Sequence, residues 1–274
     1  MQQAVVNETR ARSIAAASRF LVDLRRRLRL LGRVAFVGFW LGVLDRRTLH
    51  AIDDLAYRRW RPLYQNPEYN RRGLFEWERE AIESYFPDRG RLIVIGAGGG
   101  REVLALSAMG YDVAGVECNR VLIEAANRLL REAGSGSTVS WLPRDAAPRD
   151  RGRLDGAIVG WGAYTLMVGR KRRIRFLREL AESLASGAPV LISFYTWNGR
   201  VRHLRWIHLV ATTIRRVLGR EPVEPGDDLA PNFIHHFTAQ QVERELREGG
   251  YELCEFREQG AGTYNAGFAV GIRP

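Results

Sequence analysis

A glycine-rich turn follows a short apolar run near residue 95. The run 92–95 leads into glycines at positions 96, 98 and 100, and a helical pattern begins directly afterwards. Glycine is required where the backbone turns sharply or approaches a ligand closely, because a Cβ atom would collide there. The N-terminus of the following helix also offers unpaired N–H groups. The pattern predicts a ligand-binding loop at the end of a strand.

An acidic residue lies at the right distance to complete such a site. Glu117 follows the glycine turn by roughly twenty residues and ends a second apolar run, 113–116. A carboxylate in that place can accept hydrogen bonds from both hydroxyls of a ribose. The two features together predict a ligand that contains a ribose, and they also describe nicotinamide or flavin binding.

The glycine spacing distinguishes between two nucleotide-binding patterns. The dinucleotide fingerprint G-x-G-x-x-G ends on a small residue, which lets helix and strand pack tightly. Arg101 occupies that position here. The glycines instead follow G-x-G-x-G, and this pattern with Glu117 resembles the first motif of class I S-adenosylmethionine-dependent methyltransferases. The alternative is an α/β protein with a tight turn and no ligand.

The resemblance extends from about residue 90 to the C-terminus and implies S-adenosylmethionine as cofactor. It implies that Glu117 holds the ribose and that Asp145, just after the third strand, contacts the adenine amino group. Asp145 could equally cap a turn. No metal ligand set is expected. The expected donor-contact residues lie at the ends of neighbouring strands: Gly96, Ala97, Gly98, Gly100, Glu117, Cys118, Asp145 and Gly160.

The acceptor is constrained mainly by motifs that are missing from the segment 160–164. Methyl transfer is an in-line displacement, so alignment of donor and acceptor supplies much of the catalysis. The segment lacks the acid or amide, Pro-Pro and aromatic signature of methyltransferases that act on nucleobase amines, and the acidic ligands of catechol-type enzymes. Neither cysteine lies in a motif for attack on a pyrimidine. We therefore expect a small-molecule acceptor, such as a natural product, methylated on a hydroxyl or amine.

Several side chains are candidates for catalysis or acceptor contact beyond the strand ends. His235 and His236 could take a proton near neutral pH, but adjacent residues in an extended chain point in opposite directions, so at most one is expected in the site. Surface or structural histidines are the alternative. The other candidates are aromatic or polar: Trp161, Tyr164, Tyr195, Trp197 and Asn198, of which Trp161 and Tyr164 could instead be core residues.

Alternating apolar runs and helical patterns from residue 90 onward predict an α/β fold with helices on both faces of the sheet. The resemblance implies a doubly wound, mostly parallel seven-stranded sheet with a C-terminal antiparallel hairpin. The domain spans 90–274, with a substrate-side insertion at 197–237 that contains one helix, 201–218, and then a loop. The expected strands are 92–95, 113–116, 139–142, 157–159, 190–194, 251–257 and 266–272.

Residues 1–89 are expected to form a helical N-terminal extension. The stretch 10–31 has the spacing of a basic amphipathic helix, whose apolar face must be covered by the main domain, by a second subunit in a homo-oligomer or by a membrane surface. The stretch 48–86 is helical, rich in aromatic residues and broken by Pro62 and Pro67, which predicts a cap over the catalytic domain. The apolar stretch 30–44 is too short to span a bilayer.

The formal net charge of +11 would attract phosphates or an anionic surface. Only one of the 42 basic residues is lysine, which is typical of a coding bias toward arginine. A nucleic-acid binder or RNA methyltransferase is the main alternative, supported by the basic run 170–175; a donor-binding scaffold without activity is another. Two distant cysteines and no signal-peptide pattern favour the reducing cytoplasm.

Overall fold

The computed structural model describes residues 2–149, 153–197, 202–259 and 264–274, without the side chains of 2–17, 60, 202, 259 and 264. The chain forms two compact units. The smaller unit contains Met1–Leu44 and Arg202–Pro225, and the larger contains Asp45–Val201 and Gly226–Pro274. The expected boundary at 89/90 therefore differs from the observed one, because residues 45–89 belong to the larger unit.

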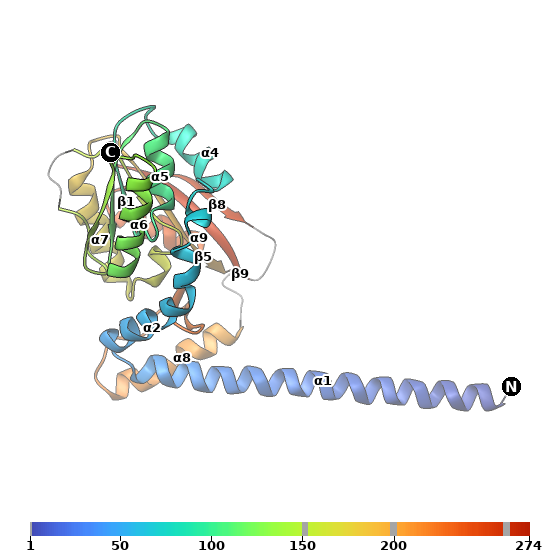
Figure 1. Ribbon diagram of the computed structural model, residues 1–274. Helices are drawn as coiled ribbons and strands as arrows, with labels where there is room; N and C mark the ends of the chain where they lie inside the picture. The colour runs from blue at the N-terminus through green and yellow to red at the C-terminus, as the bar shows by residue number, and fades with distance from the viewer. Residues whose placement is uncertain (1, 150–152, 198–201, 260–263) are drawn as a thin grey trace. The chain divides into compact units, whose positions relative to one another are not determined.

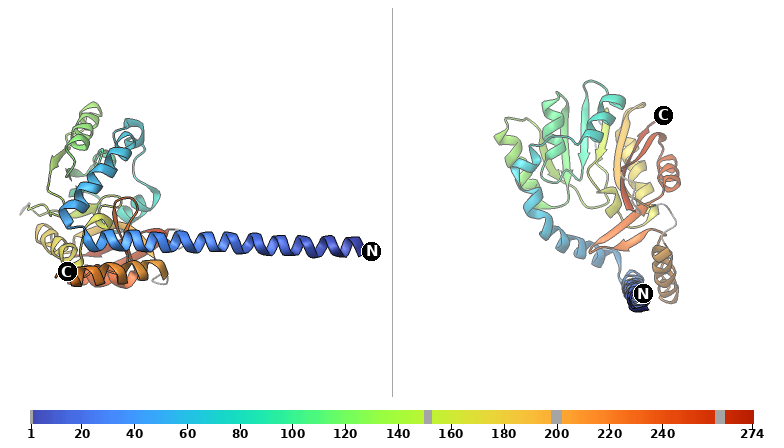
Figure 2. Two further views of the ribbon diagram at one scale, coloured as in Figure 1. Left: turned by 90° about the horizontal axis from the view of Figure 1, so that it is seen from below. Right: turned by 90° about the vertical axis from the view of Figure 1, so that its right-hand side faces the viewer.

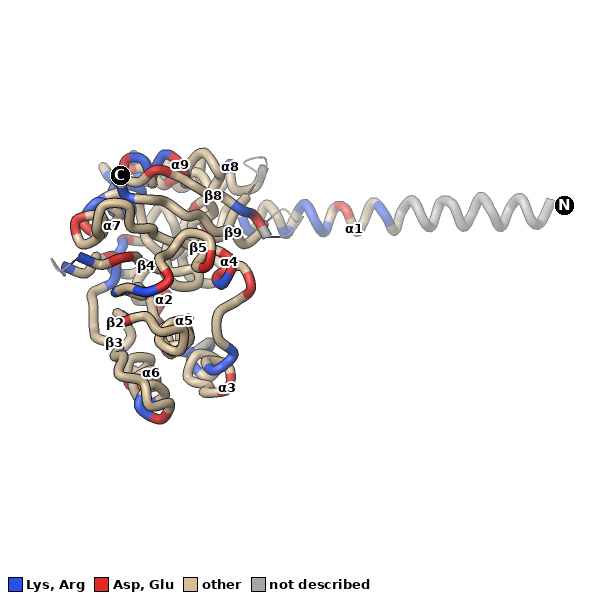
Figure 3. The backbone as a smooth tube through the Cα atoms, turned by 90° about the horizontal axis from the view of Figure 1, so that it is seen from above, with Lys and Arg blue, Asp and Glu red and all other residues tan. Residues whose placement is uncertain are grey.

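The smaller unit consists of two packed helices. Helix α1 spans Gln2–Val43 and α8 spans Arg202–Val217 (Figure 1; Figure 3 marks their basic residues). Glycines allow close approach: a Cβ on Gly38 would lie 2.8 Å from that of Val210, and one on Gly42 would lie 2.7 Å from that of Ile214. The Arg215 side chain donates to carbonyls at the end of α1, which that helix cannot satisfy itself. No helix of the described residues is long and apolar enough to cross a membrane.

The larger unit is built on a twisted, mostly parallel sheet (Figure 2, right). Its parallel strands are β3 (Thr138–Trp141), β2 (Asp112–Glu117), β1 (Arg91–Ile95), β4 (Gly156–Val159) and β5 (Pro189–Trp197), in that order across the sheet. Beyond β5, β9 (Tyr264–Ile272) pairs antiparallel with both β5 and β8 (Glu252–Gln259). The predicted fold class is confirmed, including the antiparallel C-terminal hairpin.

Each face of the sheet has its own apolar core, because successive strand residues point to opposite sides. Leu92 and Val94 face a core with α4 (Glu76–Tyr85), α5 (Arg101–Ala108) and α6 (Arg120–Glu132). Ile93 and Ile95 face the other core, with α7 (Arg170–Ser183) and α9 (Ala239–Glu248). The sheet is therefore buried on both sides, and its accessible functional surface lies at the strand ends.

A further hairpin brings the number of sheet strands among the described residues to nine. Strands β6 (Asp227–Leu229) and β7 (Phe233–Phe237) pair antiparallel, and β7 runs parallel to the last residues of β5. The sequence predicted a loop here, because the segment is short and flanked by prolines. The partner that stabilises β7 is the extension of β5 beyond its predicted end at residue 194, which is a tertiary contact.

Two helices precede α4 in the larger unit. Helix α2 (Arg46–Tyr64) is capped by Asp45, whose carboxylate accepts from the Thr48 N–H at 2.8 Å. It continues through Pro62, where a break was expected, and ends two residues later. The short helix α3 (Pro67–Asn70) begins with its proline in the first turn, where the missing N–H costs nothing. A 3-10 turn, η1 (Tyr164–Leu166), follows β4.

Candidate active site

The glycine turn after β1 adopts a backbone conformation that favours glycine. Gly96, Gly98 and Gly100 have φ angles of 71°, 52° and 90°. The N–H groups of Gly96 and Ala97 donate to the Val116 carbonyl at 2.9 and 3.0 Å, which ties the turn to β2. A Cβ on Gly160 would lie 2.7 Å from the Gly96 carbonyl oxygen. The turn therefore lies directly against the end of β4, and a larger residue at either position would fill the space.

Glu117 joins the end of β2 to the glycine turn. Its Oε2 accepts from the Gly98 N–H at 2.9 Å, and its Oε1 accepts from the Cys118 and Asn119 N–H groups at 2.8 and 2.9 Å. A carboxylate offers about four acceptor positions, so about one remains for a ligand hydroxyl. Glu117 therefore mainly holds the glycine turn in place. Both ribose hydroxyls that it is expected to bind would have to donate to the one acceptor position that is left.

Asp145 carries an unsatisfied buried carboxylate. Its φ of 62° is a left-handed conformation, which is uncommon for a residue other than glycine. Both carboxylate oxygens are buried without a hydrogen-bond partner among the described residues. The nearest basic side chains are His50, whose Nε2 lies 3.4 Å from Asp145 Oδ2, and Arg46, whose Nη1 lies 3.7 Å from the same oxygen. Buried acceptors on a strained turn favour the interpretation that Asp145 binds a ligand with an N–H donor over the interpretation that it caps a turn.

Two adjoining cavities extend from Asp145 past the glycine turn. The first is lined by Glu117, Cys118, Asp145, Leu142, Leu166 and Met167 among others. The second is lined by the glycine turn, Asn70, Arg101 and Glu102 among others. Tyr57, Gly96 and Trp161 line both. The first cavity has the apolar walls and acidic ends that suit a nucleoside, and the second is the more polar.

Tyrosines from α2 and α3 line the second cavity. Tyr57 and Tyr64 stack with ring centroids 6.0 Å apart, and Tyr69 meets Tyr64 edge-on at 6.2 Å. Burial, followed by the charge of Glu117, holds the pKa of Tyr57 well above its usual value of 10.0. Burial raises the pKa of Tyr64 to about 12. These phenols stay protonated at neutral pH, so they can donate hydrogen bonds but cannot act as bases.

Gly99 is a site residue that the spacing argument missed. A Cβ there would lie 1.9 Å from the Tyr64 carbonyl oxygen and 2.4 Å from Asn70 Nδ2. Asn70 in turn donates to that carbonyl at 2.8 Å. The end of α2 therefore rests directly on the glycine turn. The need for glycine at position 99 follows from this tertiary contact, because the φ angle of Gly99 is not left-handed.

We expect Gly99→Ala to weaken adenosyl ligand binding by about 10-fold or more, because α2 must move away to make room for the methyl group. Isothermal calorimetry with S-adenosylhomocysteine measures the affinity, and thermal unfolding measures the accompanying loss of stability. Gly136→Ala is the matched control, since a Cβ at that position meets nothing within 4 Å. Wild-type affinity in Gly99→Ala would contradict the contact.

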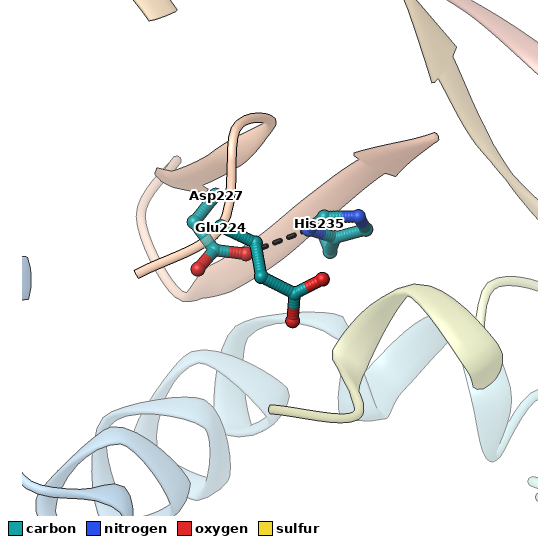
Figure 4. A group of neighbouring side chains, drawn as sticks. All are labelled: Glu224, Asp227 and His235. Atoms are coloured by element: carbon teal, nitrogen blue, oxygen red, sulfur yellow. Dashed lines mark hydrogen bonds and ion pairs between the residues drawn. The ribbon is translucent and has the colours of Figure 1, made fainter. Parts of the chain in front are cut away.

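The two candidate histidines lie on β7 and face opposite sides, as expected. His235 is fully buried, and its Nδ1 lies 2.7 Å from Asp227 Oδ1 (Figure 4). Its ring contacts Phe237 in the core, at 4.4 Å between centroids. His236 instead packs near Tyr195, at 6.2 Å between centroids. Neither histidine lines the two cavities, and His236 is buried beside Tyr195, with its Nε2 4.0 Å from Asp228 Oδ2.

Trp161 and Tyr195 form an aromatic wall at the ends of β4 and β5. Their ring centroids are 6.3 Å apart, and Trp161 also packs against Trp77 at 5.9 Å. Burial raises the pKa of Tyr195. Trp197 is buried at the end of β5 without lining either cavity, and Asn198 lies outside the described residues.

Tyr164 belongs to a buried network and does not line either cavity. Its hydroxyl donates to Glu245 Oε2 at 2.6 Å, and its ring stacks on Phe237 at 5.2 Å. Arg173 is fully buried and donates to both oxygens of Glu245, at 2.9 and 2.7 Å. The expected catalytic role of Tyr164 is therefore replaced by a structural one: a phenol held by an internal ion pair between α7 and α9 has no access to a substrate.

The basic run 170–175 that supported nucleic-acid binding is largely committed to internal contacts. Arg173 carries the buried pair just described. Arg170 pairs with Glu248, and Arg172 donates to the Val168 carbonyl at 3.4 Å. Arg175 lies 3.7 Å from Glu179 within the same helix. These contacts join α7 to α9 and to the residues just before α7, while Arg170 and Arg175 remain 40% and 62% exposed.

No protein-family model matches the sequence, and no curated protein is detectably similar to it. Solved structures do resemble it. A SAM-dependent methyltransferase from Methanosarcina mazei is 22% identical over 73% of this chain and 98% of its own, with a TM-score of 0.60. The glycopeptide N-methyltransferase MtfA bound to S-adenosyl-L-methionine is 17% identical over 72% of this chain and 92% of its own, at 0.53.

The [4+2]-cyclase SpnF resembles the chain to a similar degree, at 14% identity over 72% of this chain and 81% of its own, with a TM-score of 0.54. These likenesses establish a Rossmann-like fold, which the chain shares with S-adenosylmethionine-dependent methyltransferases. The same fold carries a cyclase, so the reaction must be argued from the site residues.

Proposed function

We propose that this chain, on its Rossmann-like methyltransferase fold, binds S-adenosylmethionine and transfers the methyl group to a hydroxyl or amine of a small molecule. The observation that carries the proposal is the unsatisfied buried carboxylate of Asp145. It lines the same cavity as Glu117. An adenine amino group would supply the N–H donor that Asp145 lacks, and a ribose hydroxyl would take the remaining acceptor position of Glu117.

The bound donor supplies an electrophilic methyl group on a sulfonium. The protein's own residues position it: the glycine turn lets a ligand lie directly against the backbone, and Leu142, Leu166 and Met167 supply apolar contacts in the first cavity. In the second cavity Asn70, Tyr64 and Tyr69 offer polar groups to the other end of the donor. Tyr57 and Trp161, which line both cavities, exclude water where the two meet.

The acceptor side is proposed to be the aromatic wall of Trp161 and Tyr195, which continues toward His236. Protonated phenols cannot remove a proton from the acceptor, so His236 is the candidate base, while His235 is structural. Aromatic walls favour a flat or apolar acceptor. A small molecule is supported further by the internal engagement of the basic run 170–175, which removes the feature that favoured RNA.

Ligand binding tests the proposal directly. We expect calorimetry to show binding of S-adenosylmethionine and S-adenosylhomocysteine and no comparable binding of NAD. Transfer of a deuterated methyl group into a cell extract, followed by mass spectrometry, then identifies the acceptor. Tight NAD binding without a response to adenosyl compounds would refute the proposal. If the protein binds the adenosyl compounds but transfers no methyl group, the proposed donor site would stand and the proposed reaction would be refuted.

Replacement of His236 by alanine is expected to lower turnover by about 10²–10⁴-fold and to leave donor affinity nearly unchanged. The wild-type rate should also fall below the pKa of this histidine, since a protonated imidazole cannot accept a proton. A pH profile at saturating donor measures this. If His236→Ala keeps full activity and the wild-type profile stays flat, catalysis rests on alignment alone.

A further inference from the structure

The smaller unit carries most of the net positive charge of the chain. Residues 1–44 and 202–225 contain thirteen arginines and four acidic residues, a net +9 of the total +11. The rest of the chain holds 29 basic and 27 acidic residues and is nearly neutral. A coding preference for arginine does not explain this difference, because the smaller unit is also depleted in acidic residues. The positive charge is a local property of α1 and α8.

An apolar stripe runs along α1 and is open to solvent. Phe20, Leu24, Leu28 and Leu31 are 66%, 40%, 58% and 66% exposed. Their spacing of three and four residues places them on one face of the helix. The arginines at 25, 26 and 29 lie on the remaining faces, Arg27 lies beside Phe20 at the edge of the stripe, and all four are exposed. Exposed Val22 and Leu30 lie outside the stripe, so the described part of α1 presents large apolar side chains interspersed with arginines to solvent.

Exposed aromatic side chains lie farther along α1 and, at about 100° per residue, on a different side of the helix from the stripe. Trp40 packs against Phe36 and Phe39, at 6.2 and 5.3 Å between centroids, and all three rings remain at least 39% exposed. On α8, Trp206 and Leu209 are 52% and 53% exposed. Soluble proteins rarely leave so many large apolar groups of one region in water unless the region binds something.

We propose that the α1–α8 pair binds the surface of an anionic phospholipid bilayer and lies in the interfacial plane. Neither helix is apolar enough to span a membrane. Exposed leucines and aromatic rings combined with many arginines are typical of helices that bind at the interface of an anionic membrane. The leucines and aromatic rings enter the acyl boundary while the arginines reach the lipid phosphates.

A bilayer is the partner that satisfies both parts of this surface. A second copy of the chain would cover the stripe but would bring one net +9 unit against another, which is unfavourable at ordinary ionic strength. RNA would neutralise the arginines but would leave Phe20, Leu28 and Leu31 in water. The inference does not depend on the proposed methyl transfer, and it can be tested with protein that has no known acceptor.

Vesicle co-sedimentation of the full chain provides the test. We expect binding to phosphatidylcholine vesicles that contain phosphatidylglycerol and little binding to phosphatidylcholine alone. Replacing Arg25, Arg26 and Arg29 by Gln should weaken binding by about 100-fold, at about 5-fold per arginine. The matched control replaces Arg128, Arg131 and Arg175, which are exposed on the larger unit, and should leave binding unchanged.

The apolar contribution is tested separately. The double variant Leu24→Ser, Leu28→Ser should bind anionic vesicles about 10-fold or more weakly. Brominated lipids should quench the fluorescence of Trp40 and Trp206, so the quenching should shrink in the variants Trp40→Phe and Trp206→Phe. Trp141→Phe is the control, because Trp141 is similarly exposed, at 48%, but lies on β3 of the larger unit.

Thermal unfolding of each variant, compared with that of the wild type, reports that the larger unit is folded, and circular dichroism reports that the helices are intact. No binding of the intact wild type to anionic vesicles would overturn the inference. Binding that the two serines leave unchanged would also overturn it, since arginines alone would then suffice. A wild-type dimer in light scattering that is lost in the serine variant would assign the stripe to a second copy instead.

Discussion

Glu117→Ala is expected to weaken the binding of S-adenosylhomocysteine by about 150-fold or more. The substitution removes a ligand contact, and it also leaves the N–H groups of Gly98, Cys118 and Asn119 without their acceptor. A lost hydrogen bond to a charged group costs about 1.5–3 kcal/mol, so even partial relaxation leaves a penalty of about 3 kcal/mol. Calorimetry measures the change in affinity.

Two further variants make this result specific. Glu117→Gln supplies one carbonyl oxygen for three N–H donors and points an N–H₂ group at them, so we expect it to recover little of the affinity. Glu124→Ala, an exposed carboxylate on α6, is the control and should bind like the wild type. Near wild-type affinity in Glu117→Ala would show that the turn holds its shape without the carboxylate.

Arg173→Met is expected to lower the free energy of unfolding by about 3–5 kcal/mol. The Arg173 and Glu245 side chains are 0% and 1% exposed, and removing one member leaves the other as an uncompensated buried charge. Urea unfolding measures the loss. The double variant Arg173→Met, Glu245→Met removes both charges and should recover most of the stability. A single variant as stable as the wild type would show that water reaches Glu245.

The pH dependence of this pair has a defined sign. Burial alone would raise the pKa of Glu245, but the hydrogen bonds and charge of Arg173 lower it below its ordinary value of 4.5. The wild-type pair therefore stabilises the fold above about pH 4.5, and this stabilisation is lost as the pH falls through the lowered pKa of Glu245. Without Arg173, burial raises the pKa of Glu245 instead. The deficit of Arg173→Met should then shrink as the pH is lowered from neutrality.

The sheet and its glycine turn could be predicted because their signals are local. Apolar runs alternate with helical segments, and the positions of Gly96, Gly98 and Gly100 require a backbone that other residues avoid. The strands of the parallel sheet were predicted to within a few residues. The hairpin β6–β7 was missed because its stability comes from pairing with the end of β5, which leaves no periodic signal in a five-residue strand.

The cofactor contacts of the candidate site stay predictions. Glu117 and Asp145 line one cavity, and Glu117 is engaged mainly by backbone N–H groups. Tyr57, Tyr64 and Tyr69 were recognised as an aromatic segment, but nothing in their spacing indicated that they line the donor cavities. The contact of Tyr64 with Gly99 joins residues 35 positions apart and exists only once α2 is folded onto the turn.

The sequence by itself determined the fold class, the glycine turn and the acids at the strand ends, because these depend on steric limits and hydrophobic periodicity within short segments. Only the tertiary structure decided which polar side chains are free to contact a ligand and which are held in the core. It placed Tyr164 and Arg173 in a buried network with Glu245, turned His235 into the core and His236 toward Tyr195, and left the apolar stripe of α1 in solvent. Burial and pairing between distant segments decide whether a side chain can act, and residue type and local spacing do not report them.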